Sequence, residues 1–210
     1  MRRRGEGRRP VRADKRGRAG ICEVMQQKKE VRILLADSFK ELVLKKPIEK
    51  ITIKEITDGA GVIRVTFYNH FQDKYELLEW IFREEVIGPL RILLWNDMVE
   101  EALTFMFNAI LKNKEFYSRA SRLEGQNSFS SIMNTCFAEL ISEYLEDHIG
   151  QGARKYEWLT PARLGDFGAQ NMTYFLMNWI HGGMQQPPEE MVEIYNFVTS
   201  HALKDLTREL

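Results

Sequence analysis

Apolar side chains recur at every third or fourth position along most of this chain, which is the spacing of one buried face of an α-helix. The first such face lies between residues 26 and 45 and contains Val31, Leu34, Leu35, Phe39 and Leu42, with Ser38 in the same stripe. Pro47 ends this predicted helix, because proline lacks a backbone N–H and restricts the residue before it.

Helical spacing also dominates residues 97–210. The strongest apolar stripe spans residues 129–145, from Phe129 to Leu145. Two further helices, about 162–182 and 187–208, are expected to form a hairpin around a Gly-Gly turn. No segment shows the alternation of apolar and polar residues that predicts a β-strand, so the predicted fold class is all-α.

Residues 51–78 predict two short helices, a tight turn between them and the start of a longer helix. Thr52 and Glu55 have the spacing of a capping box, in which each residue accepts a hydrogen bond from the backbone N–H of the other. The small residues 59–61 end the first helix, and the second is expected over 63–70. Two helices joined by a short glycine-containing turn are typical of a helix-turn-helix, whose second helix fits the DNA major groove.

The second of these helices leaves a set of polar and apolar side chains free for DNA. Phe67 and Phe71 are spaced to pack inward, and Asp73 caps the next helix. The residues left exposed are Arg64, Val65, Thr66, Tyr68, Asn69 and His70. Such side chains donate to phosphates, read base edges or touch a thymine methyl group. The alternative is a plain structural corner in which the aromatic residues all belong to the core.

This segment resembles the DNA-binding signature of the TetR family of bacterial transcription regulators. The matching positions are Gly61, Val62, Arg64, Thr66, Phe67, Tyr68, His70, Phe71, Asp73, Lys74 and Leu77. Ile63 departs from the pattern, since the family usually has a small or polar helix-capping residue there. The resemblance implies that Lys74 contacts the DNA backbone, that the helix after it links two domains, and that the last two helices form a dimer interface. Around residues 179–191 the chain is also similar, more weakly, to regulators of dihydroxyacetone kinase operons.

The net charge of zero hides an uneven distribution. Residues 1–20 carry nine basic and two acidic side chains (+7), residues 21–75 carry +2, and residues 76–210 carry −9. We therefore expect a disordered basic tail over 1–24, a helix-turn-helix domain over 25–75, and a regulatory and dimerisation domain over 76–210. The tail is either a basic arm that reaches DNA phosphates or the minor groove, or a segment upstream of a working start at Met25.

Chemical motifs that would indicate an enzyme lack their necessary partners. Asp166-Phe167-Gly168 spells a kinase metal motif without the glycine-rich loop or catalytic-loop pattern that accompanies it. The histidines do not have metal-ligand spacing, and the two cysteines fit neither a disulfide framework nor a metal site. No apolar run is long enough to span a membrane, and no secretory signal is recognised. We expect a cytoplasmic protein that is not an enzyme and has no cofactor or metal.

The sequence therefore predicts a homodimeric DNA-binding regulator, a repressor that a small-molecule effector releases from its operator. Arg64, Val65, Thr66, Tyr68, Asn69 and His70 are expected in or beside the major groove, and Thr52, Tyr68 and Lys74 at phosphates. The alternative keeps the DNA-binding helices but makes the C-terminal domain a docking surface for a protein co-regulator, as in an activator. Neither the effector nor the operator sequence can be deduced from the residues.

Overall fold

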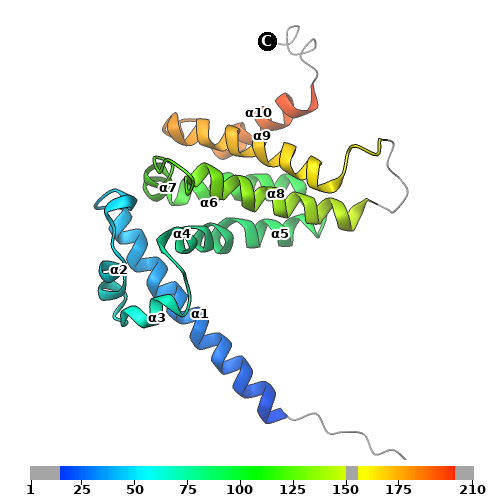
Figure 1. Cartoon of the computed structure of the whole chain (residues 1–210). Helices are drawn as coiled ribbons and strands as arrows, with labels where there is room; N and C mark the ends of the chain where they lie inside the picture. Colours follow the sequence, from blue (N-terminus) through cyan, green and yellow to red (C-terminus); the bar gives the residue numbers. More distant parts are fainter. Residues whose placement is uncertain (1–14, 150–155, 202–210) are drawn as a thin grey trace, which may run out of the picture.

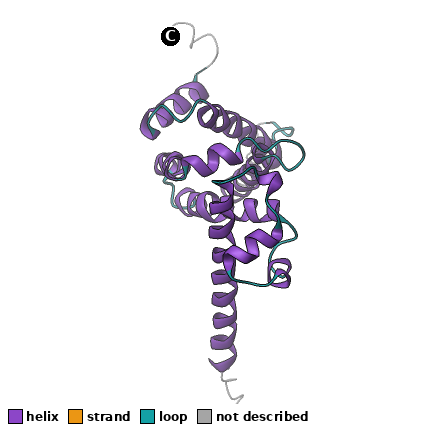
Figure 2. Ribbon diagram, turned by 90° about the vertical axis from the view of Figure 1, so that its left-hand side faces the viewer, coloured by secondary structure: helices purple, strands orange, loops and turns teal. Residues whose placement is uncertain are grey.

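A computed structural model describes residues 15–149 and 156–201. Among these residues all regular structure is helical, which confirms the predicted all-α class (Figures 1 and 2). The elements are α1 (Lys15–Val43), η1 (Ile48–Lys50), α2 (Ile53–Ala60), α3 (Arg64–Tyr68), α4 (Lys74–Phe82), η2 (Arg83–Ile87), α5 (Gly88–Leu94), α6 (Val99–Lys112), α7 (Lys114–Ala120), α8 (Phe129–His148), α9 (Pro161–His181) and α10 (Pro188–Ser200).

The helices form an N-terminal unit, α1–α3, beside a C-terminal unit, α4–α10 (Figure 1). In the C-terminal unit the helices lie in layers: α4 and α5, then α6 to α8, then α9 and α10. One continuous apolar core joins both units, from Leu35 in α1 to Val192 in α10. At its centre the Phe82 ring packs edge-on against the rings of Tyr117, Phe129 and Phe137, with centroids 5.6–6.5 Å apart.

Helix α1 is longer than its apolar stripe predicts. It begins at Lys15 rather than near residue 26. Residues 15–24, which were expected in a disordered tail, are therefore helical. The extension contains good helix formers such as Lys, Arg, Gln and Met, together with Gly17 and Gly20, which disfavour a helix interior. The remainder of the predicted tail, residues 1–14, lies outside the described residues.

Close packing of α1 on α2 depends on Gly59. The buried Ser38 hydroxyl donates to the carbonyl oxygen of Ile56 at 2.8 Å. A Cβ atom at Gly59 would meet Ser38 Oγ at 2.3 Å, so this position has room only for glycine. From the sequence, Gly59 is predicted only to end a helix, because the approach of α1 is a tertiary contact.

The helix that starts at Lys74 continues through Pro89, although proline usually ends or kinks a helix. α4, η2 and α5 follow one another without a break, and η2 is a π-helical turn. The Gly88 N–H donates to the carbonyl oxygen of Arg83, five residues earlier. Pro89 supplies no N–H and would crowd an ordinary α-helical turn, and a wider turn just before it relieves this conflict.

The last two helices follow one another through the expected Gly-Gly turn but do not pack mainly on each other as a hairpin, since α9 packs on α8 and α10 on α6. α9 and α10 begin at Pro161 and Pro188, and Gly183 in the turn between them has a φ of +78°. Ile194 and Val198, whose spacing along α10 is that of a buried helix face, are 36% and 48% exposed. Residues 202–208, the last part of that predicted helix, lie outside the described residues.

Candidate nucleic-acid interface

The capping box that opens α2 is present. Glu55 N–H donates to Thr52 Oγ1 at 3.3 Å, and Thr52 N–H donates to Glu55 Oε2 at 3.0 Å. The ammonium of Lys46 lies 2.5 Å from Glu55 Oε1. The hydrogen bond from Lys46 and those from Thr52 lower the pKa of Glu55 from 4.5 to about 2. The carboxylate therefore stays ionised, and Thr52 is held exposed at the N-terminus of α2.

The turn between α2 and α3 fixes the direction of α3. Gly61 has a φ of +67°, in the left-handed region that glycine occupies without strain, and Val62 N–H donates to the Thr57 carbonyl oxygen at 3.0 Å. Phe67 is fully buried and anchors α3 to the core. Ile63 stands at the N-cap without a side-chain cap and is 71% exposed.

The predicted contact residues gather on the outer face of α3 and the turn after it. Arg64, Val65, Tyr68 and Asn69 are exposed, whereas Thr66 and His70 are half-buried. The Arg64 guanidinium donates to the Tyr68 hydroxyl at 3.1 Å, one helical turn away. The result is a compact surface with a cation, a phenol, an amide and an exposed valine, which can bind phosphate and read base edges.

Lys74 has a structural task beside its expected one. Its ammonium donates to the carbonyl oxygens of Glu49 and Ile51, at 2.8 Å each. Partial burial, the largest cause, lowers the pKa of Lys74. An ammonium has three protons, so one donor remains for a phosphate after these two bonds. Lys74 thereby ties the start of α4 to the segment that leads into α2.

Two basic residues of α1 lie near His70 and were not singled out from the sequence. Partial burial lowers the pKa of His70, and the positive charges of Arg32 and Lys28 lower it further. The Arg32 guanidinium lies 5.6 Å from the centroid of the Phe71 ring, and its Nε is buried without a hydrogen-bond partner. Lys28 and Arg32 are four positions apart and so share one helix face, a signal that the sequence did contain.

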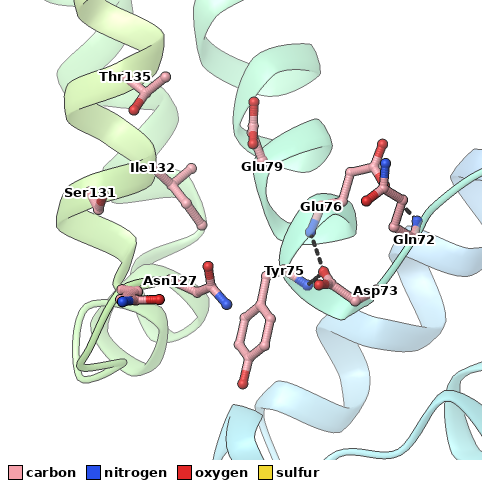
Figure 3. A pocket seen from close by; sticks show the side chains of 10 residues that line it. Gln72, Asp73, Tyr75, Glu76, Glu79, Asn127, Ser131, Ile132 and Thr135 are labelled. Atoms are coloured by element: carbon pink, nitrogen blue, oxygen red, sulfur yellow. Dashed lines mark hydrogen bonds between the residues drawn. The ribbon is translucent and has the colours of Figure 1, made fainter.

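A polar cavity of about 360 Å³ lies between the start of α4 and the start of α8 (Figure 3). Apart from the apolar Ile132, its walls carry carboxylates, amides and hydroxyls, from Gln72, Asp73, Tyr75, Glu76, Glu79, Gln126, Asn127, Ser131 and Thr135. Asp73 caps α4 as predicted, accepting from the N–H groups of Tyr75 and Glu76 at 2.8 and 2.9 Å. This lining suits a polar or cationic small molecule.

Other chemistry in the described residues is limited. Burial raises the pKa of the Cys136 thiol to about 12, which keeps it protonated and unreactive. In residues 15–149 and 156–201 no three His, Cys, Asp or Glu side chains are grouped to hold a metal ion. No helix in these ranges is long and apolar enough to cross a membrane.

Two family profiles match the chain. Residues 38–81 match the profile described as bacterial regulatory proteins, tetR family, and residues 97–200 match one described as transcriptional regulator C-terminal region. Over 52 residues the chain is 38% identical to the HTH-type dhaKLM operon transcriptional activator DhaS of Lactococcus lactis. This match covers 25% of the chain and 28% of that relative, so it spans little more than a quarter of the relative's length.

Solved structures share the fold across most of their length. The dihydroxyacetone kinase operon activator DhaS superimposes with a TM-score of 0.54 and 20% identity over 80% of this chain and 93% of that one. FadR of Thermus thermophilus, a TetR-family transcriptional repressor solved with lauroyl-CoA, gives a TM-score of 0.58 and 16% identity over 78% and 90%. Because the sequence identities are low, these superpositions establish a common fold and nothing more.

Proposed function

The chain belongs to the TetR family of DNA-binding transcriptional regulators, and from this premise we propose that it is a homodimeric repressor released from its operator by a small molecule. The observation that carries the proposal is the outer face of α3. Arg64, Tyr68 and Asn69 are exposed together there, on a helix anchored from behind by the buried Phe67. In the proposed complex this face enters the major groove, and Thr52 and Lys74 contact phosphates on either side.

The homodimer is proposed on the exposed faces of α9 and α10. Phe167 and Tyr174, two turns apart on α9, are 68% and 73% exposed. On α10, Ile194 and Val198 are also exposed, at 36% and 48%. Aromatic side chains this exposed are typical of the core of a protein interface. Two copies joined there would present two α3 helices to a two-fold related operator.

The effector is proposed to bind between the start of α4 and the start of α8. The polar cavity beside Tyr75 and Glu79 lies against the helix that starts from the DNA-binding segment, so a ligand there would act on the position of α4 (Figure 3). A coupling of about 1–3 kcal/mol is typical of such regulation. We propose that the protein acts in the cytoplasm, where its operator DNA is located.

A second candidate is an activator whose C-terminal helices dock a protein co-regulator. The likeness to DhaS, which is named as an activator, favours it, because it is found both in the 38% identity over 52 residues and in the shared fold. A metabolite panel separates the two candidates. A small-molecule regulator should gain thermal stability with one metabolite, whereas a protein dock should gain it only with a partner protein.

The proposal is tested by selecting genomic DNA fragments with the purified protein and measuring the mass of the complex. We expect enrichment of an inverted repeat and two protomers per site, or a multiple of two. If no common sequence were enriched, the proposal that the protein binds a specific operator would be contradicted. One protomer on a non-repeated site would contradict the homodimer.

A further inference from the structure

Glu85 lies where the N-terminal and C-terminal units meet. Its Oε1 accepts from the ammonium of Lys40 in α1. Its Oε2 accepts from the Tyr117 hydroxyl of α7 at 3.3 Å and from the Asn113 side-chain amide, between α6 and α7, at 3.4 Å. One carboxylate therefore joins the DNA-binding helices to the layer that contains α6 and α7.

These contacts are shielded from water. The side chains of Lys40 and Glu85 are 21% and 31% exposed, so solvent and salt screen their attraction less than that of open surface pairs. Tyr117 is fully buried, and Glu85 is the acceptor that the described residues provide for its hydroxyl. If Glu85 moved away, a buried hydroxyl and an ammonium would lose their partner together.

The backbone at Glu85 is suited to movement. Glu85 is the central residue of the π-helical turn η2, which holds one residue more per turn than an α-helix would. A change between the two registers would rotate Glu85 about the helix axis and take its carboxylate out of reach of Lys40 or Tyr117. π-helical turns within α-helices are frequent at functional sites.

Movement of Lys40 is transmitted to α2. Two positions before Lys40, the Ser38 hydroxyl holds the carbonyl oxygen of Ile56 in α2 at 2.8 Å. The contact with Gly59 leaves no slack between the two helices. A shift of α1 at Lys40 therefore displaces α2, and α3 with it.

We propose that Glu85 couples the two units: its contacts with Lys40, Asn113 and Tyr117 form one switch that α6–α7 and the DNA-binding helices both bias. This inference rests on the proposed function, because it assigns the route by which operator binding and regulation affect each other. Linkage makes the coupling reciprocal. Operator DNA must therefore act on α7 through Glu85, and this effect is measurable without a known effector.

The test is amide hydrogen–deuterium exchange of the full chain with and without operator DNA. In the wild type, operator should change exchange over residues 113–120 by about fivefold or more, the lower end of common coupling. Glu85→Gln should still bind operator and protect α2 and α3, yet lose the change over 113–120. Tyr117→Phe and Lys40→Met each remove one contact and should reduce it. Glu143→Gln is the control, because it removes an ion pair with Arg91 between α8 and α5 and leaves Glu85 untouched.

The outcomes are distinguishable. Failure to bind any specific DNA would refute the proposed function. Specific binding without a change at 113–120 in the wild type would overturn the coupling alone. An undiminished change in both Tyr117→Phe and Lys40→Met would also overturn it, whether or not Glu85→Gln folds.

Discussion

The ammonium of Lys74, in the first turn of α4, donates to the carbonyl oxygen of Ile51, just before α2, over 2.8 Å. The same ammonium holds Glu49, so one side chain fixes how α4 meets the helix-turn-helix. We expect Lys74→Met to lower the free energy of unfolding by about 1 kcal/mol, the usual net worth of a hydrogen bond. Urea denaturation measures this, with Lys112→Met on α6 as an exposed control.

The same variant separates the two roles of Lys74. If it also contacts a phosphate, Lys74→Met lowers the slope of log affinity against log salt concentration by about one. An unchanged slope would show that Lys74 positions α4 without touching DNA.

Operator affinity should depend on the Arg64–Tyr68 pair. We expect Arg64→Ala to weaken specific binding about 10- to 100-fold, because an arginine that reads a base edge is worth about 1–3 kcal/mol. Tyr68→Phe removes only the hydroxyl that Arg64 contacts and should have a smaller effect. Circular dichroism should show both variants folded. Arg119→Ala, at an exposed position of α7, serves as the control; if Arg64→Ala bound as well as this control, the assignment of α3 would be wrong.

Acid should weaken the capping box in a definite pH range. The pKa of Glu55 is about 2 in the folded chain against an ordinary 4.5, so the unfolded chain binds its proton more readily. Its contribution to stability is therefore complete above pH 4.5 and is lost as the pH falls towards 2. Urea denaturation at pH 7 and pH 3 should show a smaller loss for Glu55→Gln than for the wild type. Equal losses would mean that Glu55 is not responsible.

The exposed aromatic residues of α9 should control the oligomeric state. A charge placed at Tyr174 or Phe167 would be buried unpaired in the proposed interface, so Tyr174→Glu and Phe167→Glu should sediment as monomers. Ile92→Glu is the matched control, since Ile92 is similarly exposed, at 66%, but lies on α5. Dimers that persist in both α9 variants would place the interface elsewhere.

Lys28 and Arg32 should add to the electrostatic attraction for DNA. Their charges already act on His70 beside α3, so they lie near the proposed DNA face. We expect Lys28→Gln and Arg32→Gln each to weaken binding to operator DNA and to scrambled DNA by the same factor. Each should also lower the slope of log affinity against log salt concentration by about one. Lys112→Gln, in α6, controls for the change in net charge; the same behaviour in all three variants would exclude a local contact.

The sequence located the helix-turn-helix well because its signals are local. Thr52, Gly61 and Asp73 act through their own neighbours in the chain, and all three occupy the expected capping and turn positions. The exposed and buried faces of α3 followed from spacing alone. What spacing could not provide was the depth of Thr66 and His70, which are half-buried.

The remainder depended on tertiary contacts. Continuation of the helix through Pro89 required a π-turn that no local rule predicts. Gly59 is needed because it packs against Ser38, twenty-one positions earlier in the chain. Ile194 and Val198 have the spacing of a buried face but lie exposed, since periodicity marks an apolar face without showing which neighbour covers it. The sequence pattern does not predict the hydrogen bonds from Lys74 to the carbonyl oxygens of Glu49 and Ile51.

The central claim, that α3 reads a specific operator, is tested most directly by fluorescence anisotropy across a salt series. Labelled DNA from upstream of the protein's own gene is compared with a scrambled duplex of the same composition. We expect tighter binding to the native fragment by about a thousandfold or more, as is typical of specific regulators, with the preference reduced in Arg64→Ala. Equal and steeply salt-dependent binding to both duplexes, unaffected by Arg64→Ala, would contradict it.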